Sequence, residues 1–417
     1  MDSTLNYIPL LILSGVFVLI AVRQIGSVRL RIWQIMCLGA LACVLTGGIS
    51  IPSALRSINL DVMFFLFGMF VVGEALIKSG YLYHVSYGFF KNARNVDSLV
   101  ILILFVIGTL SAFLMNDTLA VIGTPLVLFF AEKHKINHKL LLLSLCFATT
   151  IGSVASPIGN PQNLLIAVGG NMDNPFVTFF KYLAVPTAVN LFLAYLVLKV
   201  IYKKHFHTGA LVSSREDILD TKLAWIARSS LVIIVLLVFL KIGAVVFFKG
   251  LDFRLTYIAI AAALPVIILS PRRAEVVRSI DWHTLIFFAA LFILMEGVWE
   301  SGVIQYFISE ASYDLTSVEL ILGVSVVLSQ LLSNVPFVAL YLPLLTHLGA
   351  SPLGLSALAA GSTIAGNLLI LGAASNVIII QNAEKRGHTL TFMEFAKAGI
   401  PLTVLNLIVY WVYFRVI

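Results

Sequence analysis

Amide, hydroxyl and carboxyl side chains interrupt four apolar stretches of the sequence, and these residue types could bind a solute or an ion. Two interruptions are Asn116-Asp117-Thr118 and Ser333-Asn334, and two others run from residue 159 to 163 and from 372 to 376. Irregular backbone in a membrane survives only where it is buried in protein or lines a wet cavity. The four polar loops therefore indicate a binding site.

The chemistry of such loops suits both anions and cations. Helix N-termini present unpaired N–H groups to anions, while freed carbonyl groups coordinate cations. Asn163 and Asn376 are the strongest candidates, whereas Gly159 and Gly372 are expected to serve backbone geometry. The alternative role of the amides is helix capping. The candidate binding residues are Asn116, Asp117, Thr118, Gly159, Asn160, Asn163, Ser333, Asn334, Gly372, Ser375 and Asn376.

Asp117 is the carboxylate in the middle of an apolar region, and such a residue is costly unless it has a function. We expect it to carry a proton or to bind a cation, with a sodium site near Asn116, Asp117 and Asn163. The alternative is a carboxylate that caps its own helix. The expected coupling ion is a proton or sodium, and no organic cofactor is expected.

The composition is that of a membrane protein with many crossings. The 417 residues are 60% hydrophobic and only 11% charged, with a mean hydropathy of +1.03. The net charge of +7 is read as a topology signal of cytoplasmic loops, so nucleic acid is not an expected partner. Ten crossings are predicted near residues 7–22, 31–48, 60–77, 140–169, 179–201, 228–248, 255–270, 283–299, 353–380 and 396–416.

Two further apolar regions, 98–131 and 318–348, are predicted to be re-entrant hairpins. Each arm has about fifteen residues, which gives roughly 22 Å and is too short to cross and return. With both termini outside, most Lys and Arg residues fall in cytoplasmic loops. The expected location is the plasma membrane, the inner membrane of a bacterium or archaeon.

The sequence repeats itself at a nearly constant offset. Residues 58–82 align with 280–304, the hairpin residues Ser111 and Asn116 align with Ser329 and Asn334, and Gly159 and Asn163 align with Gly372 and Asn376. Five crossings per copy require opposite orientations, the inverted repeat of secondary transporters. The chain therefore divides into a repeat at 1–201, a cytoplasmic linker at 202–227 that includes a short helix from Arg215, and a repeat at 228–417.

Other ionisable residues lie near the ends of the predicted helices. Glu74 has Lys78 at i+4, a spacing that permits an ion pair, whereas Glu296 has Glu300 at that position. Asp61 and His283 flank helix ends and are expected at the membrane interface.

The tips and breaks resemble those of the ion transporter superfamily, which contains arsenite permeases, NhaD-type sodium/proton antiporters, citrate transporters and divalent anion/sodium symporters. In the symporters each tip carries Ser-Asn-Thr, two sodium sites and the substrate site form at tips and breaks, and transport is an elevator motion. The resemblance maps the tips onto residues 115–117 and 333–335, and the breaks onto 159–163 and 372–376.

Two departures from the symporter pattern bear on the solute. The first tip has Asp117 in place of Thr, and the second has Val335. A negative charge beside the site disfavours a dicarboxylate, and the Asn-Asp pair resembles the arsenite permease branch. The resemblance thus implies a monoanion, a neutral oxyacid or proton coupling.

We therefore predict an all-α polytopic membrane protein of two inverted repeats that performs ion-coupled secondary transport of a small anion or oxyacid by an elevator-type mechanism. The alternatives are a sodium/proton antiporter, a sodium-coupled dicarboxylate transporter and an ion channel; a channel would need polar rings along its length. An enzyme is not indicated, because no nucleophile with a base and no metal-ligand set is evident. Expected partners are the solute, the lipid bilayer and a second copy of the chain in a homodimer.

Overall fold

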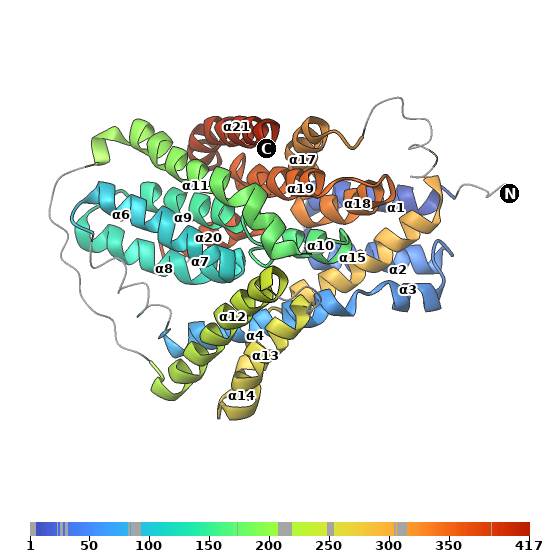
Figure 1. Cartoon of the computed structure of the whole chain (residues 1–417), viewed down its shortest axis with the longest axis horizontal. Coiled ribbons are helices and arrows are strands. Elements are labelled where there is room, and N and C mark those ends of the chain that lie inside the picture. The colour runs from blue at the N-terminus through green and yellow to red at the C-terminus, as the bar shows by residue number, and fades with distance from the viewer. Residues whose placement is uncertain are drawn as a thin grey trace.

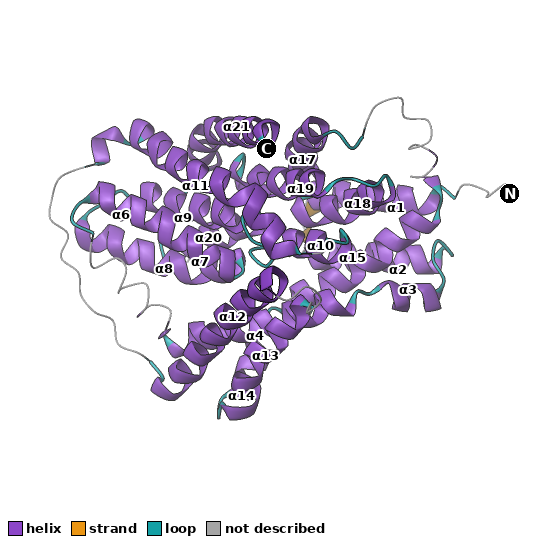
Figure 2. Cartoon of the chain, viewed as in Figure 1, coloured by secondary structure: helices purple, strands orange, loops and turns teal. Residues whose placement is uncertain are grey.

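The computed structural model shows an all-α chain (Figures 1 and 2). The residues that it describes are 6–22, 24–25, 28–29, 32–81, 84, 93–172, 174–206, 219–247, 254–303, 306, 315–384 and 386–417. Within these ranges the strands are two antiparallel pieces, β1 (Gln24–Ile25) and β2 (Val28–Arg29). The predicted all-α polytopic fold is confirmed.

The same order of elements occurs in both halves of the chain. The first half contains α1 (Ile8–Val22), α2 (Ile32–Leu45), α3 (Ile51–Ser57), α4 (Leu60–Ser79), α6 (Val96–Leu102), the π-helical η1 (Ile103–Ile107), α7 (Gly108–Phe113), α8 (Asn116–His134), α9 (His138–Ser153), α10 (Pro161–Gly169), α11 (Pro175–Ile201) and η2 (Lys203–His205).

The second half contains α12 (Thr221–Phe247), α13 (Leu255–Leu269), α14 (Arg273–Ser279), α15 (Trp282–Glu300), α17 (Val318–Leu332), α18 (Asn334–His347), α19 (Pro352–Ile364), the 3₁₀ turns η3 (Ala365–Asn367) and η4 (Ile370–Gly372), α20 (Ala374–Glu384) and α21 (Phe392–Val416). Helices α12 to α15 thus correspond to α1 to α4, and α17 to α21 correspond to the hairpin, broken helix and last helix of the first half.

Six described helices are long and apolar enough to cross a membrane: Leu60–Ser79, Val96–Phe113, Pro175–Ile201, Thr221–Lys241, Trp282–Glu300 and Phe392–Val416. The predicted crossings at 140–169 and 353–380 are each divided into shorter helices. The arms of the first hairpin, Val96–Phe113 and Asn116–His134, are longer than the predicted fifteen residues. The first arm begins early because the Asn95 side chain accepts from Ser98 N at 2.8 Å and caps the helix.

The predicted linker also ends earlier than expected. Helix α12 begins at Thr221 rather than after residue 227, because Asp220 Oδ1 accepts from Leu223 N at 2.9 Å. An aspartate at this position satisfies one of the free N–H groups of the first turn. The expected short helix from Arg215 begins within residues 207–218, which lie outside the described part of the chain.

The helices form two units, each with members from both halves. We call α1 to α4 with α12 to α15 the support unit, whose α4, α12, α13 and α14 form the lower edge of Figure 1. Within it α2 packs against α15 and α4 packs against α13, so each helix pair joins the two repeats. The hairpin unit contains α6 to α11 and α17 to α21. The two units meet where α4 contacts α8 and α10 and where α15 contacts α18.

The two broken helices run in opposite directions through the hairpin unit. Helices α8, α9 and α20 lie at the left of Figure 1, whereas α10, α18 and α19 lie to their right. Accordingly α20 packs against α8, and α10 packs against α18, so each second half-helix lies on the hairpin of the other repeat. Every residue from Leu140 to Ser153 is buried, and this part of α9 accordingly contains no charged residue.

Candidate functional site

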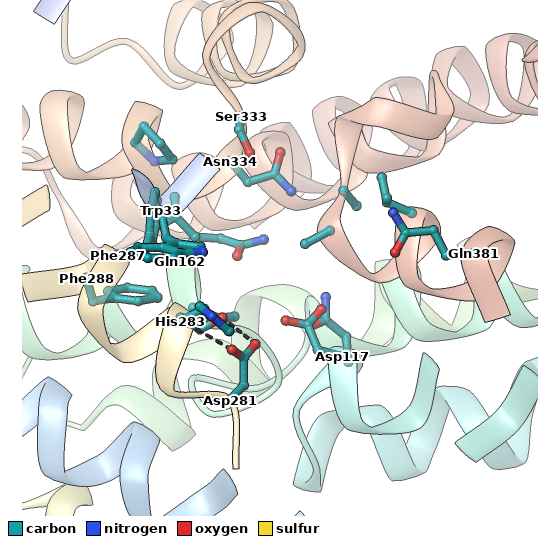
Figure 3. Close-up of a pocket in the computed structure, with 18 residues that line it drawn as sticks. Trp33, Asp117, Gln162, Asp281, His283, Phe287, Phe288, Ser333, Asn334 and Gln381 are labelled. Atoms are coloured by element: carbon teal, nitrogen blue, oxygen red, sulfur yellow. Dashed lines mark hydrogen bonds between the residues drawn. The ribbon is translucent and has the colours of Figure 1, made fainter. Parts of the chain in front are cut away.

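A cavity of about 470 Å³ lies between the two units (Figure 3). Its size is within the usual range for small-molecule sites, roughly 300–1,000 Å³. The first turns of α8, α10, α18 and α20 contribute one wall, and the start of α15 with Trp33 of α2 contributes the other. The described lining residues are Trp33, Asn116, Asp117, Pro161, Gln162, Asp281, His283, Thr284, Phe287, Phe288, Ser333, Asn334, Val335, Pro336, Ala373, Ala374, Val377 and Gln381.

The first hairpin tip brings Asn116 and Asp117 to this cavity. Its backbone is tied to the first helix break, because Asn116 N donates to Gly159 O at 3.0 Å. The residue at the N-cap of α8 is Met115, and no side chain caps this helix. Asp117 therefore lies in the first turn without making the capping hydrogen bond that was the alternative to a function.

The second tip has a strained backbone. Ser333 ends α17 and precedes α18 with φ +70° and ψ 154°, a conformation that non-glycine residues rarely adopt. Such strain tends to occur at functional sites. The next residue, Asn334, is only 6% exposed, and its Oδ1, like that of Asn116, has no hydrogen-bond partner among the described residues. Both tips thus bring an incompletely paired amide to the cavity.

Side chains stabilise the first helix break. Asn163 Nδ2 donates to the carbonyl oxygens of Ser153, Val154 and Ser156 at 3.0, 3.3 and 3.0 Å. Asn160 caps α10, since its Oδ1 accepts from Asn163 N at 2.8 Å. These bonds pair backbone groups that the break would otherwise leave unsatisfied.

The second repeat contributes to this network through Thr363. Its Oγ1 accepts from Asn160 Nδ2 and from Gln162 Nε2, each at 3.3 Å, and donates to Asn163 Oδ1 at 3.3 Å. The two breaks are therefore in direct contact through Thr363, the residue before the end of α19.

The second break depends more on its backbone. It consists of the turns η3 and η4, with Asn376 Nδ2 donating to Gly366 O at 2.6 Å and Gln330 Nε2 donating to Ala365 O. Asn376 Oδ1 and Ser375 Oγ are buried and have no hydrogen-bond partner in the described residues. The matched asparagines thus perform related roles with different numbers of bonds.

The repeat-matched glycines lie where backbone segments approach closely. A Cβ added at Gly159 would be 2.5 Å from Ser153 O and 3.0 Å from Ser111 O. At Gly372 it would be 2.6 Å from Gln330 Nε2 and 3.0 Å from Ala365 O. These distances support the expectation that both glycines serve backbone geometry.

The structure divides the predicted site residues into two groups. Asn116, Asp117, Ser333 and Asn334 line the cavity. Asn160 and Asn163 lie behind it in the first break, and Asn163 is fully buried. Thr118 instead lies against Gly73 of α4: a Cβ added at this glycine would be 2.9 Å from Thr118 Oγ1. The remaining members of this second group are Gly159, Gly372, Ser375 and Asn376. Ligand binding by any of these residues stays a prediction.

The wall contributed by the support unit was not predicted. Asp281 and His283 lie at the start of α15, and the His283 ring is 5.0 Å from the Trp33 ring between centroids. Sequence reasoning assigned His283 to the membrane interface, as a residue at a helix end. Its alignment with Asp61 was the available signal, but that alignment does not tell which helix end meets the hairpin tips.

The described lining of the cavity contains two carboxylates and no Lys or Arg. Asp117 and Asp281 are close enough for their charges to repel, and Figure 3 shows both beside the cavity. The Asp281 carboxylate accepts from Thr284 N at 3.0 Å and from Thr284 Oγ1 at 2.6 Å. Among the described residues no hydrogen bond or ion pair of the Asp117 carboxylate occurs, so positive charge or hydrogen-bond donors from a ligand would complement it. Elsewhere in the support unit, the predicted Glu74–Lys78 ion pair is confirmed at 3.6 Å.

Comparisons with known proteins find relatives that match most of the chain. The chain is 27% identical over 379 residues to a 46 kDa membrane protein of Mycobacterium leprae, covering 85% of this chain and 86% of that protein. It is 29% identical over 368 residues to an uncharacterized transporter of Mycobacterium tuberculosis, covering 84% of each chain. The human P protein is 24% identical over 95% of this chain, which spans 58% of that protein's length.

The sequence model of one family, described as citrate transporter, matches residues 16–359, which is more than half of the chain. This family lies in the ion transporter superfamily that the tips and breaks predicted, and the match indicates a transporter rather than an enzyme. The chain therefore belongs to the CitMHS citrate transporter family.

Proposed function

We propose that this protein is an ion-coupled secondary transporter of a small anion or neutral oxyacid. The observation that carries the proposal is the convergence of four helix N-termini on one cavity whose wall contains Asp117. Helix N-termini favour an anionic or oxygen-rich group, because their N–H groups are free to donate. Asp117 supplies the negative charge that a proton or sodium ion would neutralise. The same cavity can thus bind a solute and a coupling ion together.

The charge of the cavity restricts the solute. A free di- or tricarboxylate would meet Asp117 and Asp281 without a described Lys or Arg to balance it. A monoanion or a neutral oxyacid avoids this repulsion and still accepts hydrogen bonds from the helix N-termini. Citrate, which the family description names, is therefore the informative comparison solute.

The arrangement of the units supports elevator-type alternating access. The tips and breaks all belong to the hairpin unit, whereas Trp33, Asp281 and His283 belong to the support unit. Movement of one unit against the other would carry the bound solute along the support unit and change the side on which the cavity opens. Termini outside the cell and a location in the bacterial inner membrane are parts of this proposal.

Cation/proton antiport is the second candidate, and the acceptor-rich cavity favours it. Two carboxylates and two incompletely paired asparagines could hold a cation without any organic solute. The two candidates differ in one respect, because an antiporter moves the cation against protons when no anion is present.

The test is uptake into vesicles that contain purified protein. We expect saturable uptake of a small oxyacid when a proton or sodium gradient is imposed, and none when the gradient is collapsed. Citrate, a monocarboxylate, arsenite and sodium alone serve as parallel substrates. Sodium/proton exchange without any solute would favour the antiporter, whereas unsaturable flux without a gradient would reject both and indicate a channel.

A thermal-shift screen provides an independent measure of binding. A ligand at 100 times its Kd stabilises the folded state by about 2.7 kcal/mol. The screen compares each solute with and without sodium and at several pH values. Stabilisation that requires solute and cation together is expected for a symporter.

A further inference from the structure

Asp281 has a structural role that does not require its charge. It precedes α15 and caps the first turn through Thr284 N. The repeat-matched residue, Asn59, precedes α4 and caps it in the same way, with its Oδ1 accepting from Val62 N at 3.1 Å. Asparagine and aspartate are about equally good helix caps. The first repeat thus shows that a neutral amide is sufficient for this cap, and the charge at position 281 needs another explanation.

The starts of α4 and α15 also differ in whether the nearby carboxylate charge is balanced. Near Asn59, the carboxylate of Asp61 is neutralised by Arg254 at 3.0 Å and accepts from Thr256 Oγ1 at 2.9 Å. Near Asp281, the residue that matches Asp61 is His283, whose ring lies 5.0 Å from that of Trp33 at an interplanar angle of 38°. No ion pair of Asp281 occurs among the described residues. The start of α15 therefore brings an unbalanced carboxylate to the cavity, whereas the start of α4 does not.

Buried amides face the same space. Asn116 and Asn334 are each 6% exposed, line the cavity, and have an Oδ1 without a hydrogen-bond partner in the described part of the chain. Oxygen atoms of carboxylates and amides are the ligands that hard cations prefer, and two neighbouring carboxylates can also share one proton. The titratable side chains that face the cavity are Asp117, Asp281 and His283; the described lining residues of α2, α10, α18 and α20 contribute none.

We infer that Asp281 is a second coupling residue and shares one positive charge, a proton or a sodium ion, with Asp117 across the cavity. This inference rests on the proposed function of the cavity. Asp117 belongs to the hairpin unit and Asp281 to the support unit, so the shared charge joins the two units in this conformation. When the units move apart, Asp117 loses this partner and the charge is released or travels with the solute. Binding of the ion is thereby linked to the position of the hairpin unit.

The experiment measures ion binding by purified protein through its melting temperature, as a function of sodium at constant pH and of pH without sodium. The variant is Asp281→Asn, which keeps the cap. The matched control is Asn59→Asp, which places a carboxylate at the equivalent cap outside the described cavity lining. His283→Gln separates the imidazole from the carboxylates. Asp117→Asn and the double variant Asp117→Asn/Asp281→Asn complete a double-mutant cycle.

We expect Asp281→Asn to shift the sodium or the pH midpoint by about tenfold or one pH unit. In the absence of the ion its melting temperature should be no lower than that of the wild type, because the cap is kept and the repulsion from Asp117 is removed. The double variant should show no more loss than Asp117→Asn alone, and Asn59→Asp should keep the wild-type midpoint. The shift caused by Asp281→Asn should also appear in the His283→Gln background, because it comes from the carboxylate. A sodium response identifies the shared ion as sodium, and a pH response identifies it as a proton.

The inference is overturned if Asp281→Asn retains both wild-type midpoints, if the two substitutions are additive, or if the wild type responds to neither ion. Failure of the proposed transport is distinguishable from these results, because it would show as absent uptake by wild-type vesicles while the ion still shifts the melting temperature.

Discussion

The two repeats bring the same kinds of elements to the cavity but stabilise them differently. In the first repeat, Asn163 and Asn160 bind the loop between α9 and α10 with side-chain hydrogen bonds. In the second repeat, 3₁₀ turns form most of the break, and the Asn376 side chain makes one hydrogen bond among the described residues. The first tip has a carboxylate, whereas the second has Val335 and the strained Ser333. The tips and breaks thus share their geometry, while the tip carboxylate and most of the side-chain hydrogen bonds of the breaks belong to the first copy.

The largest predicted effect concerns the charge of the first tip. Asp117→Asn should lower gradient-driven uptake by roughly 100-fold, because a group that exchanges protons contributes on this order. Val335→Asn, at the matched position, should have a far smaller effect. Uptake into vesicles at fixed solute concentration provides the measurement, with Asp117→Asn/Val335→Asp as a test of whether the carboxylate can act from the other tip. Wild-type ion dependence in Asp117→Asn would return this residue to a structural role.

The next prediction compares the two break asparagines. Asn163→Ala should destabilise the protein by about 3 kcal/mol, since several buried carbonyl groups lose their donor. Asn376→Ala removes one such bond and should cost about 1 kcal/mol. Denaturant unfolding in detergent measures both. Equal losses would show that the second break is as dependent on its side chain as the first.

The two glycines allow a similar comparison, with a smaller expected loss of stability. Gly159→Ala should destabilise by about 2 kcal/mol, because the added methyl group meets backbone atoms that cannot move freely. Gly372→Ala should cost about 1 kcal/mol, since the nearest atom belongs to the flexible side chain of Gln330. Melting temperatures of the two variants decide the order, and the reverse order would show that the Gln330 side chain accommodates the added methyl group less readily than the backbone around Gly159 does.

Helices α10 and α20 differ at their first residue, which is Pro161 in one and Ala374 in the other. Ala373 before it is extended, with φ −137° and ψ 140°, as the residue before a proline should be. Ala374→Pro should therefore stabilise the second break by about 0.5 kcal/mol. A lower melting temperature would indicate that the Ala374 N–H has a partner that proline removes.

The smallest effect concerns the far ends of α4 and α15. Lys78 of α4 pairs with Glu275 of α14 at 3.0 Å, whereas the matched residue on α15 is Glu300. Hydrogen bonds from Arg272, and then from Lys78, lower the pKa of the exposed Glu275 carboxyl to about 2.

Its stabilisation is present above pH 4.5, the ordinary value, and is lost as the pH falls towards 2. Because the group is exposed, the effect should be small. Melting curves of the wild type and Glu275→Gln across this range should converge at the acid end. A constant difference between them would show that the carboxylate charge is not the cause.

Much of the fold could be predicted because its signals are local. Apolar stretches of membrane length, their interruption by asparagine, glycine and proline, and the repeated order of these features are visible without any contact map. The start of α12 was placed too late because Lys222 in its first turn was counted with the basic linker, whereas the Asp220 cap begins the helix.

The candidate site could be predicted only in part. Asn116 and Asp117 were expected at the binding site and line the cavity, whereas the stronger candidate Asn163 is buried in the first break, behind the cavity. A sequence shows that an amide is in an apolar region, but not whether its partners are loop carbonyls or a ligand. Both roles favour the same residue type at the same position.

The sequence by itself determined the two repeats, the hairpin tips and the helix breaks, since each depends on neighbouring residues and on the length needed to cross a bilayer. The tertiary structure decided which side chains meet. Helix α2 packs on α15 and α4 on α13, across the repeats, and this exchange brings Asp281 rather than Asp61 to the cavity opposite Asp117. Such a choice depends on packing between segments far apart in the chain, for which local residue patterns carry no information.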